Sequence, residues 1–174
     1  MKQNLVIHFM GPDKPGLVRS VSNVVNQFDG NWLDSKMSLL AGRFAGLACV
    51  EIAADKEDAL TLALQNLQGV VCTVEAAEIT EEIANTRVLG MNIVGPDRPG
   101  IVHDVTLALE AHVANVVDME THIAAAPMSG ELTFSADASI EVPYEMDWSV
   151  IADQLDEVAT KLGVDILLDD DSGQ

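Results

Sequence analysis

Two octapeptides decide the fold of this chain: "GPDKPGLV" at residues 11–18 and "GPDRPGIV" at residues 95–102. Six of the eight letters match, and the other two are conservative exchanges. Four of the six prolines in the 174 residues lie in these two stretches. Because proline and glycine are the strongest local markers of turns, each octapeptide predicts a loop. The same loop recurs 84 residues further on, which favours two small domains of equal plan.

The residues around each loop predict the same order of elements. Short apolar runs indicate strands, and apolar residues spaced by three and four indicate helices. In the first half we expect strand 4–10, helix 17–28, strands 32–41 and 43–53, helix 55–69 and strand 70–79. In the second half we expect strand 87–94, helix 101–113, strands 116–125 and 131–142, helix 147–163 and strand 164–168. Asp55 and Asp147 are the expected N-caps, and Gly69 and Gly163 the expected stops.

Both halves therefore have the order βαββαβ, which is the ferredoxin-like unit of the α+β class. Each unit should hold an antiparallel four-stranded sheet and two helices, with domains at residues 1–82 and 86–170. The face of the first strand that meets the helices is expected to carry Leu5, Ile7 and Phe9, or Leu89, Met91 and Ile93 in the second half. The apolar face of helix 101–113 is expected to carry Ile101, Val102, Val105, Leu109 and Val113.

The two cysteines, Cys49 and Cys72, fall on strands that flank the first strand. They would be about 9.6 Å apart, beyond disulfide reach, so buried free thiols are expected. Two such small domains have thin cores. We therefore expect a homo-oligomer, with a dimer favoured, or a tight pairing of the two halves.

The charge of the chain limits its partners. The net charge is −19, from 9 Lys and Arg against 28 Asp and Glu. This leaves no basic stripe for phosphates, so direct nucleic-acid binding and binding to an anionic membrane are not expected. No signal peptide or membrane span is visible, and the cysteines make no disulfide framework, so we expect a cytoplasmic protein. The four histidines lack metal-ligand spacing, and no metal is expected.

The repeated loop has the chemistry of a small-anion site. A proline just before a helix fixes the backbone φ angle in a geometry that suits the first turn. The glycine has no side chain to block a ligand, and the first-turn amides can bind a carboxylate. An aspartate in each loop could accept a hydrogen bond from the ammonium group of a ligand. An asparagine opens the strand that follows the helix; we expect it to lie beside the first strand and to orient the ligand. The residues in these roles are Pro15, Gly16, Asp13 and Asn31 in the first half, and Pro99, Gly100, Asp97 and Asn115 in the second. Such a site would suit a free amino acid.

A purely structural interpretation is open at this point. The loop could be a well-made strand-to-helix turn with aspartate as its cap. The asparagine after Gly30 could tolerate a left-handed backbone.

Tandem βαββαβ units with G-x-D-[KR]-P-G after the first strand, and Asn at the start of the second, resemble ACT domains. The chain as a whole, with "DSKMSLLAGRFAGLACVEIA" after the first Asn, is similar to the glycine cleavage system transcriptional repressor family. The resemblance implies a regulator that senses an amino acid, glycine above all. It also implies control of the glycine cleavage system through contact with a LysR-type transcription activator, without direct DNA binding. The candidate ligand-binding residues are Gly11, Asp13, Gly16, Leu17, Asn31, Asp97, Arg98, Gly100, Ile101 and Asn115.

Two alternatives remain beside this hypothesis. An ACT-only regulatory subunit of an amino-acid metabolic enzyme would have the same sequence features. A small enzyme of the acylphosphatase type shares the fold and needs an Arg in its phosphate loop. Arg98 occupies the second loop, but Lys14 stands in the first and Asp97 would repel phosphate. We therefore expect no enzyme activity and no cofactor.

Overall fold

The structure is a computed structural model that describes residues 1–77, 85–127 and 129–170. The chain divides into two compact units, Met1–Thr80 (unit 1) and Glu81–Gln174 (unit 2). The expected end of the first domain at residue 82 lies outside the described residues, as does the end of the predicted strand 70–79. No helix of the described part is long and apolar enough to cross a membrane.

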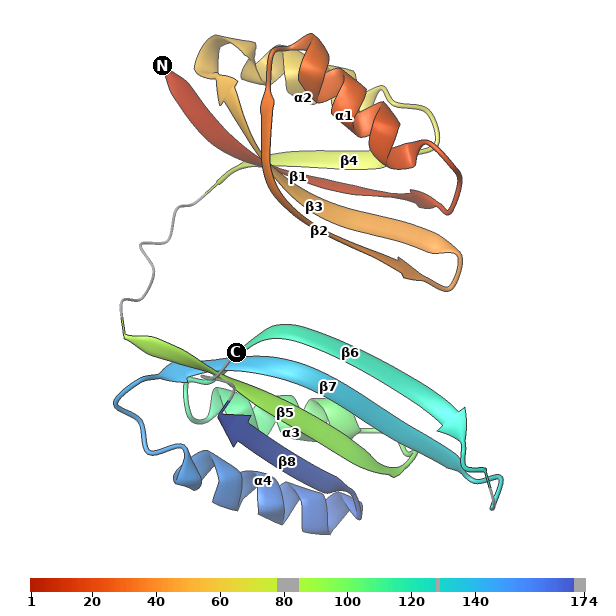
Figure 1. Cartoon of the computed structure of the whole chain (residues 1–174), viewed down its shortest axis with the longest axis vertical. Coiled ribbons are helices and arrows are strands. Elements are labelled where there is room, and N and C mark those ends of the chain that lie inside the picture. Colours follow the sequence, from red (N-terminus) through yellow and green to blue (C-terminus); the bar gives the residue numbers. More distant parts are fainter. Residues whose placement is uncertain (78–84, 128, 171–174) are drawn as a thin grey trace. The chain divides into compact units, whose positions relative to one another are not determined.

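Unit 1 has the predicted βαββαβ order, with one short 3-10 turn added before its second helix (Figure 1). Its elements are β1 (Lys2–Pro12), α1 (Leu17–Gln27), β2 (Asn31–Leu40), β3 (Arg43–Ala53), η1 (Ala54–Lys56), α2 (Glu57–Gln65) and β4 (Val71–Ala76). The sheet order is β2-β3-β1-β4, and all its pairs are antiparallel.

Unit 2 repeats this plan. Its elements are β5 (Thr86–Pro96), α3 (Ile101–Glu110), β6 (Asn115–Ala125), β7 (Leu132–Pro143), α4 (Ser149–Leu162) and β8 (Asp165–Asp170). The sheet order β6-β7-β5-β8 matches that of unit 1. Both edge strands, β2 and β6, begin at the predicted asparagine and carry a bulge at the same place, between Trp32 and Asp34 or between Val116 and Asp118. The predicted fold class is confirmed.

Each unit has its own core on one face of its sheet, where both helices lie (Figure 1). The alternation predicted for the first strands is confirmed. Leu5, Ile7 and Phe9 are buried in unit 1, and Leu89, Met91 and Ile93 are buried in unit 2. Because side chains alternate along a strand, the intervening residues lie on the opposite face. That face, which the helices leave uncovered, is called here the open face.

Several local predictions are wrong. Lys56, and not Asp55, is the N-cap of α2, because a 3-10 turn occupies residues 54–56. Helix α2 ends at Gln65, four residues before Gly69. Trp148 is the N-cap of α4, although the Asp147 carboxylate accepts from the Ser149 amide at 3.1 Å. Gly163 ends α4 as predicted, with a left-handed φ of 67°.

The predicted apolar face of the second-half helix is only partly correct. Ile101, Val105 and Leu109 are buried, whereas Val102 is 40% exposed and Val113 is 76% exposed. Helix α3 ends at Glu110, so Val113 lies in the following turn with φ 57°. The buried-thiol prediction holds for Cys72 and is wrong for Cys49, which pairs with Val6 on the open face and is partly exposed.

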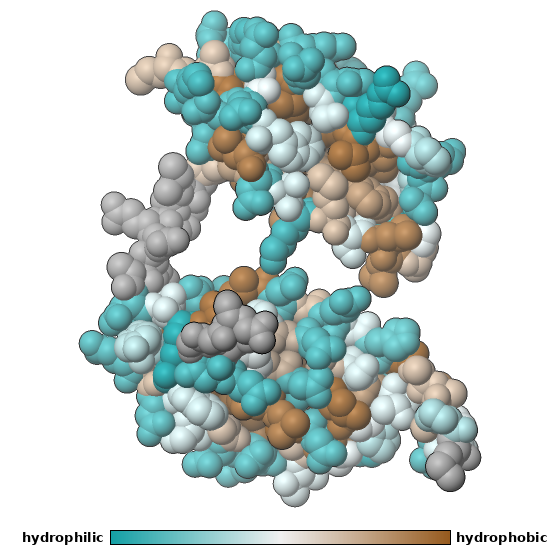
Figure 2. Space-filling model, in the orientation of Figure 1, coloured by the Kyte–Doolittle hydropathy of each residue, from teal (hydrophilic) through white to brown (hydrophobic). Residues whose placement is uncertain are grey.

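The β2–β3 hairpin of unit 1 is a tight turn at Ala41 and Gly42, both with positive φ, as two-residue hairpins favour. Leu39 and Leu40, beside that turn, are exposed. Figure 2 shows hydrophobic surface over this end of the hairpin. The corresponding connection of unit 2 is longer, as the sequence predicts.

Candidate functional site

The repeated loop has the same backbone in both units. Its first two residues complete a strand, and the helix begins at Leu17 in unit 1 or Ile101 in unit 2. Gly16 and Gly100 are the N-caps, with φ of 96° and 100°, a region that L side chains avoid. Leu17 and Ile101 are buried, so only their backbone amides could reach a ligand.

Backbone hydrogen bonds attach each loop to the neighbouring hairpin. The Asp13 amide donates to the Gly42 carbonyl at 3.0 Å, and the Asp97 amide donates to the Leu132 carbonyl at 2.8 Å. The first glycine of the motif is required by packing. A Cβ on Gly11 would lie 2.8 Å from the Gly69 oxygen, and one on Gly95 would lie 2.7 Å from Val164. The loop is therefore held on two sides in each unit.

The aspartates of the motif do not cap their helices. Gly16 and Gly100 are the N-cap residues, and neither helix has a side-chain cap. The structural interpretation of Asp13 and Asp97 as caps is therefore wrong. Both side chains are exposed, and each aspartate precedes the first residue of an α-helix by four positions. The first three amides of that helix have no intrahelical partner and carry partial positive charge.

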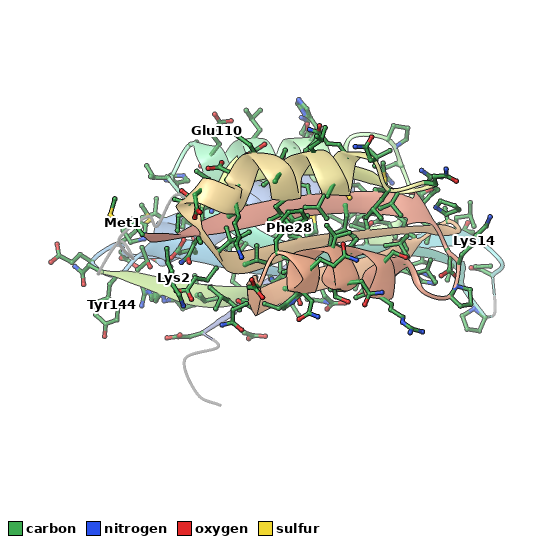
Figure 3. All side chains as sticks on the ribbon, turned by 90° about the horizontal axis from the view of Figure 1, so that it is seen from above. Met1, Lys2, Lys14, Phe28, Glu110 and Tyr144 are labelled. Carbon is green, nitrogen blue, oxygen red and sulfur yellow. The ribbon has the colours of Figure 1, made fainter. Side chains whose placement is uncertain are left out.

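The motif asparagines lie far from the loop of their own unit. Asn31 pairs with Glu51, which pairs with Asn4 near the start of β1, whereas the loop follows Pro12 at the other end. Eight strand residues separate those ends by about 26 Å. In Figure 3, Lys14 of the loop lies at the opposite end of the view from Lys2. The loop and the asparagine of one unit do not come together.

Two further interpretations of the asparagines are corrected. Strand β2 is an edge strand, and β3 separates it from β1, so Asn31 does not enter the sheet beside the first strand. Asn115 on β6 has the same placement, opposite Glu141. The left-handed residue is not Asn31 but Asp29, with φ 58°, two positions earlier. A tolerance of left-handed backbone therefore does not explain either asparagine.

Arg98 faces the end of a helix. Its guanidinium Nη2 lies 3.5 Å from the position that a Cβ would take at Gly163, the C-cap of α4. A cation there is favourable, because the last carbonyls of a helix carry partial negative charge. This contact gives Arg98 a structural role in unit 2, whether or not a ligand also reaches it.

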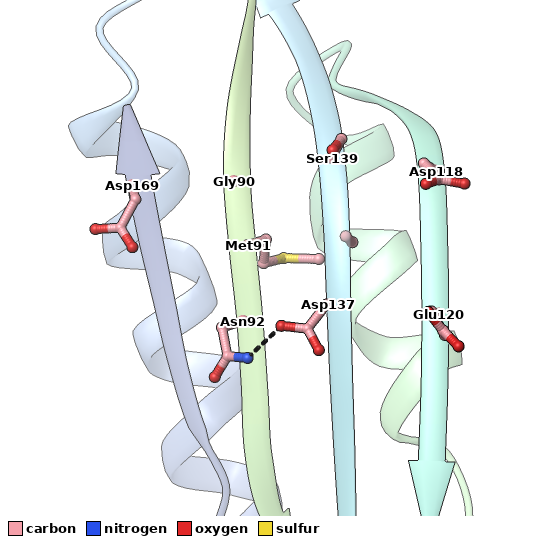
Figure 4. A pocket seen from close by; sticks show the side chains of 9 residues that line it. Gly90, Met91, Asn92, Asp118, Glu120, Asp137, Ser139 and Asp169 are labelled. Atoms are coloured by element: carbon pink, nitrogen blue, oxygen red, sulfur yellow. Dashed lines mark hydrogen bonds between the residues drawn. The ribbon is translucent and has the colours of Figure 1, made fainter. Parts of the chain in front are cut away.

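A concavity that the sequence analysis did not single out lies on the open face of unit 2. Its volume is about 330 Å³ (Figure 4). Its lining includes four carboxylates, from Asp118, Glu120, Asp137 and Asp169. The Asn92 amide donates to Asp137 at 2.8 Å. None of the candidate ligand-binding residues lines it. The signal in the sequence was the alternation of acids on β6, at positions 118 and 120.

The acids of the open face do not form a metal centre. Within the described residues, no group of three or more histidine, cysteine, aspartate or glutamate side chains could hold a metal ion. The shifted carboxyl pKa values lie elsewhere. Hydrogen bonds from His103 and Lys161 lower the pKa of Asp104, and the hydrogen bond from Lys56 lowers that of Asp29. Both pairs tie a helix to another element, α4 to α3 and η1 to the end of α1. Neither pair includes a residue of the repeated loop.

Comparisons with known proteins agree with this architecture. A family model described as "ACT domain" matches residues 3–75 and 87–168. The chain therefore belongs to the ACT domain family and is a tandem ACT-domain regulatory protein. No curated protein sequence matches it.

Two solved structures are similar to the chain over its length. One is an unknown protein from Galdieria sulphuraria, with 29% identity and a TM-score of 0.87 over 97% of this chain and 98% of the other. The other is a "putative glycine cleavage system transcriptional repressor", with 18% identity and a TM-score of 0.70 over 97% of each chain. At that identity the second likeness concerns the fold.

Proposed function

We propose that the protein senses a small amino acid, glycine first among the candidates, and regulates the glycine cleavage system without catalysis of its own. The observation that carries the proposal is the repeated loop. Twice it carries an exposed aspartate four residues before the first residue of a helix whose first-turn amides have no intrahelical partner. An amino acid offers a carboxylate to the amides and an ammonium group to the aspartate, so its two charges fit this pair. The choice of glycine rests on the name of the similar repressor.

The position of the asparagines refines the proposed site. Each asparagine lies at the end of its sheet remote from its own loop. A site that uses both groups therefore cannot lie within one unit. The ligand-binding residues that we propose are the ten candidates named from the sequence. Leu17 and Ile101 would contribute their backbone amides, because their side chains are buried.

The proposed output is a protein contact in the cytoplasm. With a net charge of −19 the chain is unsuited to phosphate backbones, and a LysR-type activator is the proposed partner. Recovery of this activator from cell extract on the immobilised protein, with glycine-dependent yield, is the expected result. Recovery of an amino-acid metabolic enzyme in its place would favour the regulatory-subunit alternative.

Calorimetric titration with each of the twenty amino acids tests the sensing site. Loss of one carboxylate–ammonium bond costs about 1.5–3 kcal/mol, or roughly tenfold to a hundredfold in affinity. Asp13→Ala and Asp97→Ala should each weaken binding by this amount at their own loop. Asp58→Ala, at an aspartate on α2 that is also exposed, is the matched control. Gly16→Val and Gly100→Val should abolish binding at their own loops. Affinity changes below threefold in both aspartate variants would place the site elsewhere.

A further inference from the structure

A glycine in a central strand of unit 2 has no local structural reason. Gly90 lies on the open face of β5, between β7 and β8. The nearest described atom to a Cβ at this position would be the Asp169 oxygen, 3.9 Å away, and Gly90 is not among the residues with positive φ. Glycine weakens the interior of a strand and often marks a place where a ligand or another backbone approaches closely. The strand thus keeps a destabilising residue where a side chain would fit.

The same position in unit 1 holds a valine. Across the four strands of unit 2, the row that contains Gly90 reads Asp118, Ser139, Gly90 and Asp169 (Figure 4). The equivalent row of unit 1 reads Asp34, Cys49, Val6 and Glu75. Both rows have acids at their ends, but the two middle residues are smaller in unit 2. The concavity of about 330 Å³ lies over these smaller residues and has room for a long side chain from a partner.

The charges around this concavity favour a cation. In the next row Glu120 lies directly opposite Asp137, and like charges in that arrangement destabilise a sheet. The same two positions of unit 1 hold Lys36 and Leu47. Among the described strand residues of the open face of unit 2, only His122 could bring a positive charge, and it lies one row further along β6. A cationic side chain in the concavity would relieve this repulsion.

The acidic surface is wider than one small ligand. Asp165 and Asp169 lie on β8 four residues apart, which is about 13 Å along the strand. From β6 to β8 the sheet measures about 14 Å, because three strand spacings separate them. Exposed apolar side chains lie on the same face, namely Val88, Val94 and Leu167. A protein segment with several basic residues would contact the whole of this surface, whereas a small cation would contact only part of it.

We propose that the open face of unit 2 is the docking surface for a basic segment of a partner protein, and that an arginine side chain of this segment enters the concavity beside Gly90. Arginine suits the position because its guanidinium binds carboxylates through paired hydrogen bonds, and because arginines in interface pockets often dominate binding. The inference rests on the proposed function in one respect, the output through a protein contact, and it names the surface for that contact.

Fluorescence anisotropy with a labelled peptide measures the docking. The probe is a short peptide of arginine, alanine and serine, and its matched control carries citrulline, which has the shape of arginine without the charge. The full chain should bind the arginine peptide about tenfold more tightly than the citrulline peptide, with an affinity that falls as salt is added. The test uses neither glycine nor the activator, so a negative result would overturn the docking surface and leave the proposed sensing site standing.

Gly90→Val is the decisive variant, because it fills the concavity without a change of charge. Its urea midpoint should not fall below that of the wild type, since the added Cβ has room and β-branched residues suit strands. Its affinity for the arginine peptide should fall on the order of tenfold. Glu120→Gln/Asp137→Asn should cause a similar loss. Asp156→Asn/Glu157→Gln, with the same charge change on exposed positions of α4, should leave the affinity unaltered.

Four results would overturn the proposal. The first is a wild type that binds neither peptide, or binds both equally. The second is an unchanged affinity in both open-face variants. The third is binding of ethylguanidinium as tight as that of the arginine peptide, which would make the concavity a small-molecule site. The fourth is a change of oligomeric state in Gly90→Val by sedimentation velocity, which would show that a second copy of the chain occupies this face.

Discussion

At matching positions of the two open faces, Lys36 of unit 1 stands beside Leu47, and Glu120 of unit 2 stands beside Asp137. The strand residues of the open face of unit 1 carry three acids and three Lys or Arg side chains, namely Asp34, Glu51, Glu75, Lys2, Lys36 and Arg43. Those of unit 2, among the described strands, carry six acids and no Lys or Arg; the acids are Asp118, Glu120, Asp137, Glu141, Asp165 and Asp169. The helix-side residues keep the fold in both units, whereas the open faces have become chemically different surfaces.

The largest expected effect is the loss of stability when a core leucine is truncated, and it tests whether the two units have matching but separate cores. Leu5 and Leu89 hold the same register position, and both are fully buried. Leu5→Ala and Leu89→Ala should each lower the free energy of unfolding of their own unit by about 2–5 kcal/mol, because each leaves a cavity in a separate core. Hydrogen exchange read peptide by peptide should show the loss in the mutated unit. An equal loss of protection in both units from either variant would contradict separate cores.

The next effect tests the two loops. Gly11→Ala and Gly95→Ala should each cost about 1–3 kcal/mol, since the added Cβ would overlap Gly69 or Val164. Gly90→Ala is the control, because the nearest atom to its Cβ would be the Asp169 oxygen, 3.9 Å away. Urea unfolding of the three variants measures the difference. If the control is as destabilised as the other two, close packing is not the reason for the motif glycines.

A smaller effect concerns the turn after the first helix of each unit. Asp29 and Val113 occupy the same left-handed position, with φ of 58° and 57°. Asn and Asp tolerate this region, whereas a β-branched residue is strained there. Val113→Asn should therefore stabilise unit 2 by about 1 kcal/mol, and Asp29→Val should destabilise unit 1. Thermal unfolding measures both. A destabilised Val113→Asn variant would show that the exposed valine makes a favourable contact.

The smallest effect depends on pH. The bonds from His103 and Lys161 hold the pKa of Asp104 below its usual value, so ionised Asp104 favours the folded state. This contribution is present at neutral pH, above the unfolded pKa, and is lost as pH falls through the lowered folded pKa. Asp104→Asn should lower the urea midpoint at pH 7 and have little effect at pH 2. An equal effect at both pH values would rule out ionisation as the cause.

The element order, the first-strand alternation and the loops could be predicted because each depends on residues close together in the chain. The position of Asn31 could not, since strand order is a property of the whole sheet and puts β3 between β2 and β1. The α2 cap was missed because a 3-10 turn shifts the helix start past Asp55. The exposure of Val113 was missed because α3 ends three residues earlier than its apolar spacing suggests. The acidic concavity requires four strands to be placed side by side.

The unequal open faces also bear on how the chain folds during synthesis. Two tandem repeats with the same register can exchange equivalent strands, a common error in the folding of repeat proteins. If β6 took the place of β2, Glu120 would lie beside Leu47, and if β2 took the place of β6, Lys36 would lie beside Asp137. The first exchange replaces Asp34 and Lys36 by the two acids Asp118 and Glu120. The second exchange replaces the like-charged Glu120–Asp137 pair by an opposite pair, so β2 is by charge a competitor of β6 for the edge of the second sheet. The order of synthesis favours the correct pairing, because β2 and β3 emerge first and can form their own hairpin before β7 exists.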